Sequence, residues 1–262
     1  GGGKAMDLGL AGTRVLVAGA SQGIGQGIAE ALLEEGAKVL LTGRSEGPLQ
    51  AAYDAFAAQH GDRVAQHAAD MTATDGITGA FAAITEAFGG VDAVIANVGG
   101  GGLKPGWDVN DDDLAYALEQ NLTGTVRLAR EAMRHLQGRE GTSLTVISSI
   151  AGVNALGAPH SYGIAKAGLN HFVANLAKEV GPAVRVNSVA PGNILFPGGS
   201  WERNVAARPE AWQRWIDREV ALKRFGTVRE IADVVAFLTS PRAAFVTGAT
   251  WVVDGGQVKS TA

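Results

Sequence analysis

Tyr162 and Lys166 are the two residues whose types and spacing best suit acid–base chemistry. They are four residues apart near the start of a helix expected over residues 161–180, so the phenol and the ammonium share one helical face. A cation beside a phenol favours the phenolate and lowers a tyrosine pKa that is otherwise about 10. Such a shift would let the tyrosine exchange protons near neutral pH. On its own, this spacing more often reflects a helix-surface tyrosine that has a lysine neighbour by chance.

Ser149 and Asn121 are polar residues placed where they could assist this pair. Ser149 comes 13 residues before Tyr162, just past a strand expected over residues 143–148, and its hydroxyl could bond a substrate oxygen. The alternative is an ordinary turn residue. Asn121 lies within a long helix expected from residue 111 to about residue 137, where asparagine competes with the backbone for hydrogen bonds. This placement predicts that Asn121 holds a water molecule or braces the backbone.

A glycine-rich turn follows an apolar run at residues 15–18 that suits a strand buried on both faces. Its glycines, Gly19, Gly23 and Gly25, have the spacing G-x-x-x-G-x-G, and a helical pattern follows up to Gly36. Such a turn lets a diphosphate approach the backbone, and the N–H groups of the helix N-terminus attract its charge. The glycines alone are equally compatible with a tight turn that binds nothing.

Strand-like and helical patterns alternate along nearly the whole chain. Strands are expected at residues 15–18, 38–42, 64–68, 91–96, 143–148, 184–189 and 250–253. Further helices are expected at residues 48–60, 74–88, 111–137, 161–180, 210–222 and 227–239, with residues 191–209 irregular. This alternation predicts an α/β fold: a single doubly wound Rossmann-type domain with about seven parallel strands and helices on both faces. Ligands of such folds bind beyond the carboxyl ends of the strands.

Several expected helices begin with side chains that suit caps. Thr74 or Asp75 is expected to cap the helix at residues 74–88, and Thr227 with Glu230 has the pattern of a capping box. Three aspartates at residues 111–113 open the long helix, where their charge suits the helix dipole. Three consecutive helical residues cannot point one way, so they do not predict a metal site, and we expect none.

The composition and charge of the chain exclude several classes of protein. Its 262 residues are 46% hydrophobic and 18% charged, which is typical of a folded globule. The absence of cysteine excludes disulfides, thiolate metal sites and cysteine nucleophiles. The net charge of −4 gives no general attraction to nucleic acid or anionic membranes, and no apolar run approaches the about 20 residues that span a bilayer. With no signal-peptide pattern at the start, we expect a cytoplasmic protein.

A series of short motifs runs through the chain from about Leu10 to Gly256. They are Ala18-Gly-Ala-Ser-Gln-Gly-Ile-Gly25, Asp70, Ala96-Asn-Val-Gly99, Asn121-Leu-Thr-Gly124, Ile147-Ser-Ser149, Tyr162-x-x-x-Lys166, Pro191-Gly192 and Val253-Asp-Gly-Gly256. Each is weak by itself. In this order and at this spacing, the series resembles the short-chain dehydrogenase/reductase family, of the compact single-domain type that includes many 3-oxoacyl reductases and sugar dehydrogenases.

This resemblance implies an oxidoreductase that transfers a hydride between a nicotinamide cofactor and a ketone or secondary alcohol. Tyr162 would be the general acid when a ketone is reduced and the general base when an alcohol is oxidised. Lys166 would lower the tyrosine pKa and hold the nicotinamide ribose, Ser149 would orient the carbonyl, and Asn121 would hold a relay water. The residues implied to bind the cofactor are Gly19, Ser21, Gln22, Gly23, Ile24, Gly25, Arg44, Asp70, Met71, Asn97, Gly99, Tyr162, Lys166, Pro191, Gly192 and Ile194.

The resemblance also implies how the chain is organised and what it binds. Residues 7–262 would form a single dinucleotide-binding and catalytic domain with a substrate loop at about residues 191–222. Residues 1–6 look like a cloning remnant before a native Met6. The partners of the protein would be a small carbonyl or alcohol substrate and copies of itself in a homotetramer, with no nucleic acid and no membrane. The alternative is a catalytically silent NAD(P)-binding regulatory protein, which the complete set of four catalytic residues disfavours.

The residues after the second expected strand bear on the choice of cofactor. An acidic residue at the position of Gly43 would bond the ribose 2′-hydroxyl of NAD(H), whereas the arginine that follows, Arg44, can pair with the 2′-phosphate of NADP(H). We therefore favour NADP(H), with NAD(H) possible because Arg44 could stack on adenine with either cofactor. Phe196 stands where the family usually has a threonine against the nicotinamide carboxamide, so the expected clamp on that ring lacks a hydroxyl.

The expected substrate loop is rich in tryptophan and arginine, and two interpretations are open. In one, an aromatic pocket uses an arginine to bind an anionic group. In the other, which the spacing favours, an amphipathic lid helix packs Trp212, Trp215 and Ile216 inward and leaves Arg214 and Arg218 in solvent.

Overall fold

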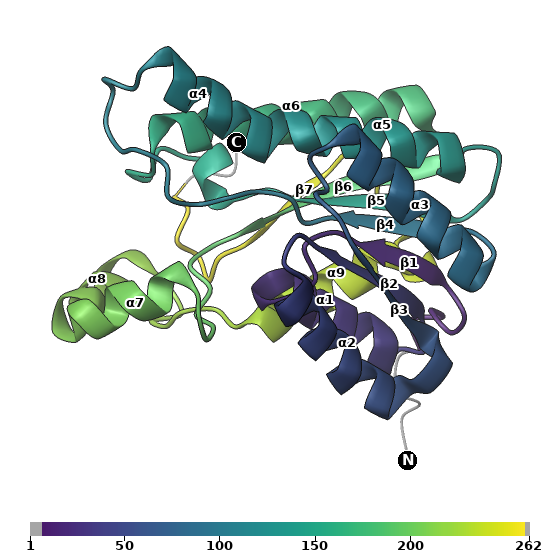
Figure 1. The fold of residues 1–262 in the computed structure, drawn as a ribbon. Coiled ribbons are helices and arrows are strands. Elements are labelled where there is room, and N and C mark those ends of the chain that lie inside the picture. The colour runs from purple at the N-terminus through teal and green to yellow at the C-terminus, as the bar shows by residue number, and fades with distance from the viewer. Residues whose placement is uncertain (1–6, 260–262) are drawn as a thin grey trace.

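The computed structural model describes residues 7–259, and within them seven parallel strands form one sheet in the order β3-β2-β1-β4-β5-β6-β7 (Figure 1). The strands are β1 (Arg14–Val17), β2 (Lys38–Gly43), β3 (Val64–Ala68), β4 (Ala93–Ala96), β5 (Thr142–Ile147), β6 (Val184–Pro191) and β7 (Thr250–Val253). The predicted doubly wound Rossmann-type α/β fold is confirmed. The proposed cloning remnant, residues 1–6, lies outside the described residues.

Helices cover both faces of the sheet (Figure 1). One layer holds α1 (Gly23–Glu34), α2 (Glu46–His60) and α9 (Val228–Thr239), and the other holds α3 (Thr74–Phe88), α4 (Asp111–Leu118), α5 (Gly124–Leu136) and α6 (His160–Val180). Two helices, α7 (Ser200–Ala207) and α8 (Pro209–Glu219), project from one end. The prediction that residues 191–209 are irregular was therefore wrong where α7 lies. Within residues 7–259, no helix has the length and apolar character needed to cross a bilayer.

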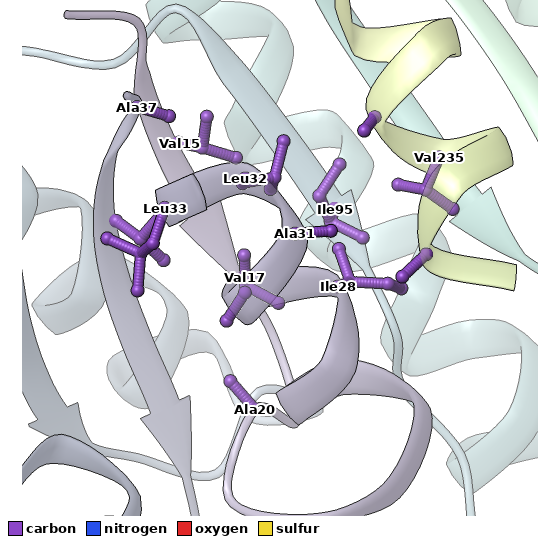
Figure 2. Packing of buried hydrophobic residues seen from close by; sticks show 14 of the residues in the cluster. Val15, Val17, Ala20, Ile28, Ala31, Leu32, Leu33, Ala37, Ile95 and Val235 are labelled. Carbon is purple, nitrogen blue, oxygen red and sulfur yellow. The ribbon is translucent and has the colours of Figure 1, made fainter. Parts of the chain in front are cut away.

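The hydrophobic core forms two clusters, one on each face of the sheet, because successive strand residues point to opposite faces. In β1, Val15 and Val17 belong to the cluster that includes α1 and α9, whereas Leu16 belongs to the cluster with α3, α5 and α6. Figure 2 shows the first cluster, where Ile28 of α1 and Val235 of α9 approach each other. Burial on both faces explains why the strands are continuous apolar runs in the sequence.

The helix predicted over residues 111–137 is present, but it is not a regular α-helix throughout. Between α4 and α5 lies the π-helical turn η2 (Glu119–Thr123), whose extra residue leaves no clear mark in a hydrophobic pattern of helical period. The side chain of Asn110 caps α4 by accepting a hydrogen bond from the N–H of Asp113 at 2.8 Å. In residues 7–259, no group of three or more His, Cys, Asp or Glu side chains is placed to hold a metal ion.

The predicted helix caps had different outcomes. At α3, neither Thr74 nor Asp75 is the cap, because the chain enters the helix one residue earlier and Ala73 occupies the N-cap position. At α9, the capping box is confirmed: Thr227 accepts from the N–H of Glu230, whose carboxylate accepts from the N–H of Thr227 at 2.9 Å. The second prediction succeeded because a capping box is specified by two residues rather than by one.

Candidate active site

The carboxyl ends of the strands form one edge of the sheet, and the candidate site residues lie there. In spatial order from β3 to β6, these strands are followed or ended by Asp70, Arg44, Gly19, Asn97, Ser149 and Pro191. The direction of the strand order reverses between β1 and β4, which marks the switch point where ligands of doubly wound sheets bind. Residues that are far apart in the sequence therefore meet along a single line.

Tyr162, in the first turn of α6, is half-buried and hydrogen-bonded to the side chain of Ser149. Ser149 follows β5, and its Oγ also accepts a hydrogen bond from the N–H of Ala151 at 3.2 Å. Burial raises the pKa of Tyr162, and the hydrogen bond with Ser149 lowers it only in part. The tyrosine pKa therefore lies above its ordinary value. The prediction of a lowered pKa was wrong for this structure because it considered the neighbouring lysine but not burial.

Lys166 lies one helical turn after Tyr162, and only 4% of it is exposed. Its Nζ donates a hydrogen bond to the carbonyl oxygen of Ile147 at 3.2 Å and lies 5.6 Å from the centroid of the tyrosine ring. Burial disfavours the charged ammonium and lowers its pKa to about 8. Burial thus favours the neutral form of both side chains, and the lysine can gain or lose a proton near physiological pH.

Asn121 is completely buried in the π-helical turn η2. Its Nδ2 donates to the carbonyls of Gly100 and Ala117, and its Oδ1 accepts from the N–H of Gly100, each at 3.2 Å. These bonds hold the loop after β4 against the helix. A Cβ at Gly99 would lie 2.7 Å from Oδ1 of Asn121 and 3.4 Å from Nζ of Lys166, so both side chains meet at this glycine. Of the two roles predicted for Asn121, these bonds support bracing of the backbone.

The glycine turn between β1 and α1 is folded tightly on itself. Nδ2 of Asn97 donates to the carbonyl oxygen of Gly19 at 3.1 Å, and a Cβ at Gly25 would lie 2.0 Å from that same oxygen. The N-cap residue of α1, Gln22, makes no side-chain capping bond, and the first turn contains no acidic residue. The positive end of the helix is therefore not neutralised by its own side chains, which suits an anion such as a diphosphate.

Asp70 follows β3, and its Oδ1 accepts hydrogen bonds from the N–H and the hydroxyl of Thr72 at 2.9 and 2.7 Å. Burial raises the pKa of Asp70, but these bonds and the charge of the exposed Arg44 outweigh burial and hold the pKa below its usual value. An ionised and oriented carboxylate thus lies at this end of the edge. Thr72 was not among the residues predicted from the sequence, although the pattern Asp-x-Thr is typical of an Asx turn and could have indicated it.

Comparison with known proteins gives matches along almost the whole chain. A family model described as enoyl-(acyl carrier protein) reductase matches residues 19–257. The chain is 36% identical over 249 residues to the 3-oxoacyl-acyl-carrier-protein reductase of Vibrio cholerae, covering 94% of this chain and 98% of that protein. It is 34% identical over 251 residues to glucose 1-dehydrogenase of Gluconobacter oxydans, covering 94% of this chain and 92% of that protein. L-sorbose reductase from Gluconobacter frateurii, solved in complex with NADPH and L-sorbose, has a TM-score of 0.88 and 31% identity, covering 97% of this chain and 100% of that one.

The chain belongs to the short-chain dehydrogenase/reductase family. The predicted family is confirmed, and so is the predicted enzyme class, an NAD(P)-dependent oxidoreductase acting on CH–OH groups. An NAD(P) cofactor is typical of this family. The residues present fit such a cofactor, since a tight glycine turn, a helix N-terminus without acidic side chains and an oriented carboxylate lie along one edge.

The remaining residues that were predicted to bind the cofactor lie along the same carboxyl edge of the sheet. Met71 and Ile194 are both 5% exposed, and Ile24 is half-buried in the first turn of α1. Ser21 lies against the end of β2, where a Cβ at Gly43 would be 3.2 Å from its Oγ. This contact joins the glycine turn to the strand that precedes Arg44, so the two predicted cofactor segments are neighbours.

The substrate loop expected for the family leaves the sheet after Gly192, whose N–H donates to the carbonyl of Val253 at 2.9 Å, and then forms α7 and α8. The ring centroids of Trp201 and Trp212 are 4.9 Å apart, and those of Trp212 and Trp215 are 5.7 Å apart. The arginines of this region are all exposed: Arg203, Arg208, Arg214 and Arg218. With tryptophans packed together and arginines in solvent, the loop agrees with the amphipathic-lid interpretation.

Proposed function

We propose that this protein transfers a hydride between NADP(H) and a ketone or secondary alcohol, with Tyr162 as the general acid or base. The observation that carries the proposal is the convergence of Ser149, Tyr162, Lys166 and Asn121 beside the glycine turn. These residues come from three separate segments, and their meeting at the strand edge supports a shared chemical task. Family membership supports the same reaction class.

The proposed mechanism assigns the hydride to the bound cofactor and the proton to the protein. The hydroxyl of Ser149 donates a hydrogen bond to the substrate carbonyl and orients it toward Tyr162. The phenol of Tyr162 then gives its proton to the carbonyl oxygen, which acquires negative charge as the carbonyl carbon is reduced. In the reverse direction the phenolate takes the proton of the alcohol. The raised tyrosine pKa keeps the phenol protonated near neutral pH, which suits reduction.

Lys166 and Asn121 support Tyr162 in this proposal rather than react with substrate. The ammonium stabilises the phenolate that remains after proton transfer, and with a pKa of about 8 it can return a proton. Asn121 forms hydrogen bonds with the backbone of Gly100 and so fixes the position of the loop beside Lys166.

Incubation with NADPH or NADH and a panel of ketones tests the proposed reaction. The panel should contain ketoses and 3-oxoacyl esters, because relatives include an L-sorbose reductase, a glucose dehydrogenase and a 3-oxoacyl reductase. Reduction is detected as loss of the absorbance of reduced nicotinamide, with formation of the alcohol confirmed by mass spectrometry. Tight cofactor binding without turnover of any substrate would instead support the silent regulatory protein.

The preference for NADP(H) is tested by the Arg44→Gln variant. Removing a charged partner of the 2′-phosphate is expected to raise the Kd for NADPH about tenfold, about 1.4 kcal/mol, and to change the Kd for NADH by less than about twofold. Both constants are measured by fluorescence titration. Arg134→Gln, at an exposed arginine of α5, is the matched control. An equal loss of affinity for NADPH and NADH in the variant would show that Arg44 stacks on adenine. Tighter binding of NADH than of NADPH by the wild type would contradict the preference for NADP(H).

A homotetramer and a cytoplasmic location stay predictions in this proposal. The tetramer is supported by large apolar side chains on the outer helices: Tyr116 on α4 is 56% exposed, and Ile164 on α6 is 57% exposed. Light scattering on the purified protein is expected to give the mass of four chains. A monomer mass at micromolar concentration would contradict the tetramer.

A further inference from the structure

Phe196 lies over the glycine turn that begins α1. A Cβ at Gly23 would lie 2.7 Å from Cε2 and 2.8 Å from Cζ of Phe196, so the ring covers the open face of this glycine. On its other side, a Cβ at Gly199, the N-cap residue of α7, would lie 3.0 Å from Cε2. The ring is half-buried and packs against the core cluster that includes α1. It therefore occupies a slot between two helix N-termini, with glycine backbone on both sides.

The space in front of Gly23 is the space that a diphosphate needs. Glycine is required in such turns because it lets the backbone approach the diphosphate more closely than a Cβ would allow. At Gly23, which has a φ of +57°, that approach lies on the side now covered by an aromatic ring. The ring of Phe196 and a bound diphosphate therefore cannot occupy this position together.

The backbone around Phe196 is held on both sides of the residue. The N–H of Leu195 donates to the carbonyl of Gly226 at 2.9 Å, and the N–H of Gly226 donates to the carbonyl of Asn193 at 3.0 Å. After the ring, the N–H of Gly199 donates to the carbonyl of Phe196 at 3.1 Å. All three bonds join backbone atoms, so rotation of the Phe196 side chain breaks none of them. These bonds therefore hold the loop without fixing the ring.

We propose that Phe196 is an aromatic gate on the dinucleotide site. Its ring closes the glycine turn in the free protein and rotates away when the diphosphate of a dinucleotide binds. This inference rests on the proposed function, because it concerns the same cofactor site. Opening the gate costs affinity, since the ring gives up apolar contacts with α1 and α7. A ligand without a diphosphate does not meet the gate.

The test compares the wild type with the Phe196→Ala variant by isothermal titration calorimetry, which measures binding without turnover. The probes are NADPH, ADP-ribose and 2′-AMP, of which only the first two contain a diphosphate. Loss of the ring is expected to lower the Kd for NADPH and for ADP-ribose about tenfold, about 1.4 kcal/mol. The Kd for 2′-AMP is expected to stay the same. A gain in affinity for 2′-AMP as large as the gain for NADPH would contradict a gate that acts on the diphosphate.

Two control variants separate the gate from general effects on the loop. Phe196→Tyr keeps the ring and is expected to bind like the wild type, and Leu195→Ala, at a neighbouring side chain that is 39% exposed, is expected to do the same. Thermal unfolding verifies that each variant is folded. If the wild type binds NADPH and Phe196→Ala binds it equally or more weakly, the proposed gate is wrong and the proposed function stands. If neither the wild type nor any variant binds a dinucleotide, the gate and the proposed function are both wrong.

Discussion

Replacing Tyr162 with phenylalanine is expected to lower kcat for ketone reduction about 10²- to 10⁴-fold, the usual contribution of a positioned general acid. The substitution removes only the hydroxyl, which is hydrogen-bonded to Ser149 and supplies the proton to the carbonyl oxygen in the proposed mechanism. The ring remains, so packing around the first turn of α6 is preserved. The Kd for NADPH, measured by fluorescence titration, is expected to stay within about threefold of the wild type, about 0.7 kcal/mol.

Tyr53→Phe is the matched control for this prediction, because it removes the hydroxyl of a half-buried tyrosine on α2, in the helix layer opposite α6. Its kcat is expected to equal that of the wild type. Full reductase activity in Tyr162→Phe on a good substrate would show that another group donates the proton, and the proposed mechanism would be wrong. A loss of NADPH binding as large as the loss of kcat would point to a cofactor-holding role instead.

The Lys166→Met variant is expected to reveal the cost of burying an ammonium. Lysine has a pKa of 10.5 in the unfolded chain and about 8 in the folded protein, because burial disfavours its charge. Between these two values the unfolded state binds more protons, so the contribution of Lys166 to the free energy of unfolding rises with pH. From about pH 7.5 to about pH 10, the free energy of unfolding of the wild type is expected to rise by about 2 kcal/mol relative to Lys166→Met.

The measurement is urea unfolding of both proteins at the two pH values, without cofactor. Methionine is unbranched like lysine and suits a buried site, so the comparison isolates the charge. Lys178→Met, at an exposed position on the same helix, is the control and should differ from the wild type by the same amount at both pH values. A pH-independent difference for Lys166→Met would show that this lysine titrates alike in the folded and unfolded states.

The residues of the candidate site were mostly found from the sequence, whereas their environments were not. The spacing of Tyr162 and Lys166 placed them on one helical face, and Ser149 was recognised by its position after a strand. The direction of the tyrosine pKa was wrong, because burial of Tyr162 and Lys166 depends on packing by segments distant in the chain. Asn121 was recognised as unusual, but its partner Gly100 is 21 residues earlier and could not be named.

The positions of the strands along the chain, the glycine turn and the capping box of α9 were predicted from the sequence alone. Each depends on local chemistry: runs of apolar side chains, glycines at close spacing, and a pair of residues that exchange hydrogen bonds with the nearby backbone. Tertiary structure decided the π-helical turn at Asn121, the buried state of Lys166 and the position of Phe196 over Gly23. These features depend on contacts between segments that only folding brings together, so no local pattern specifies them.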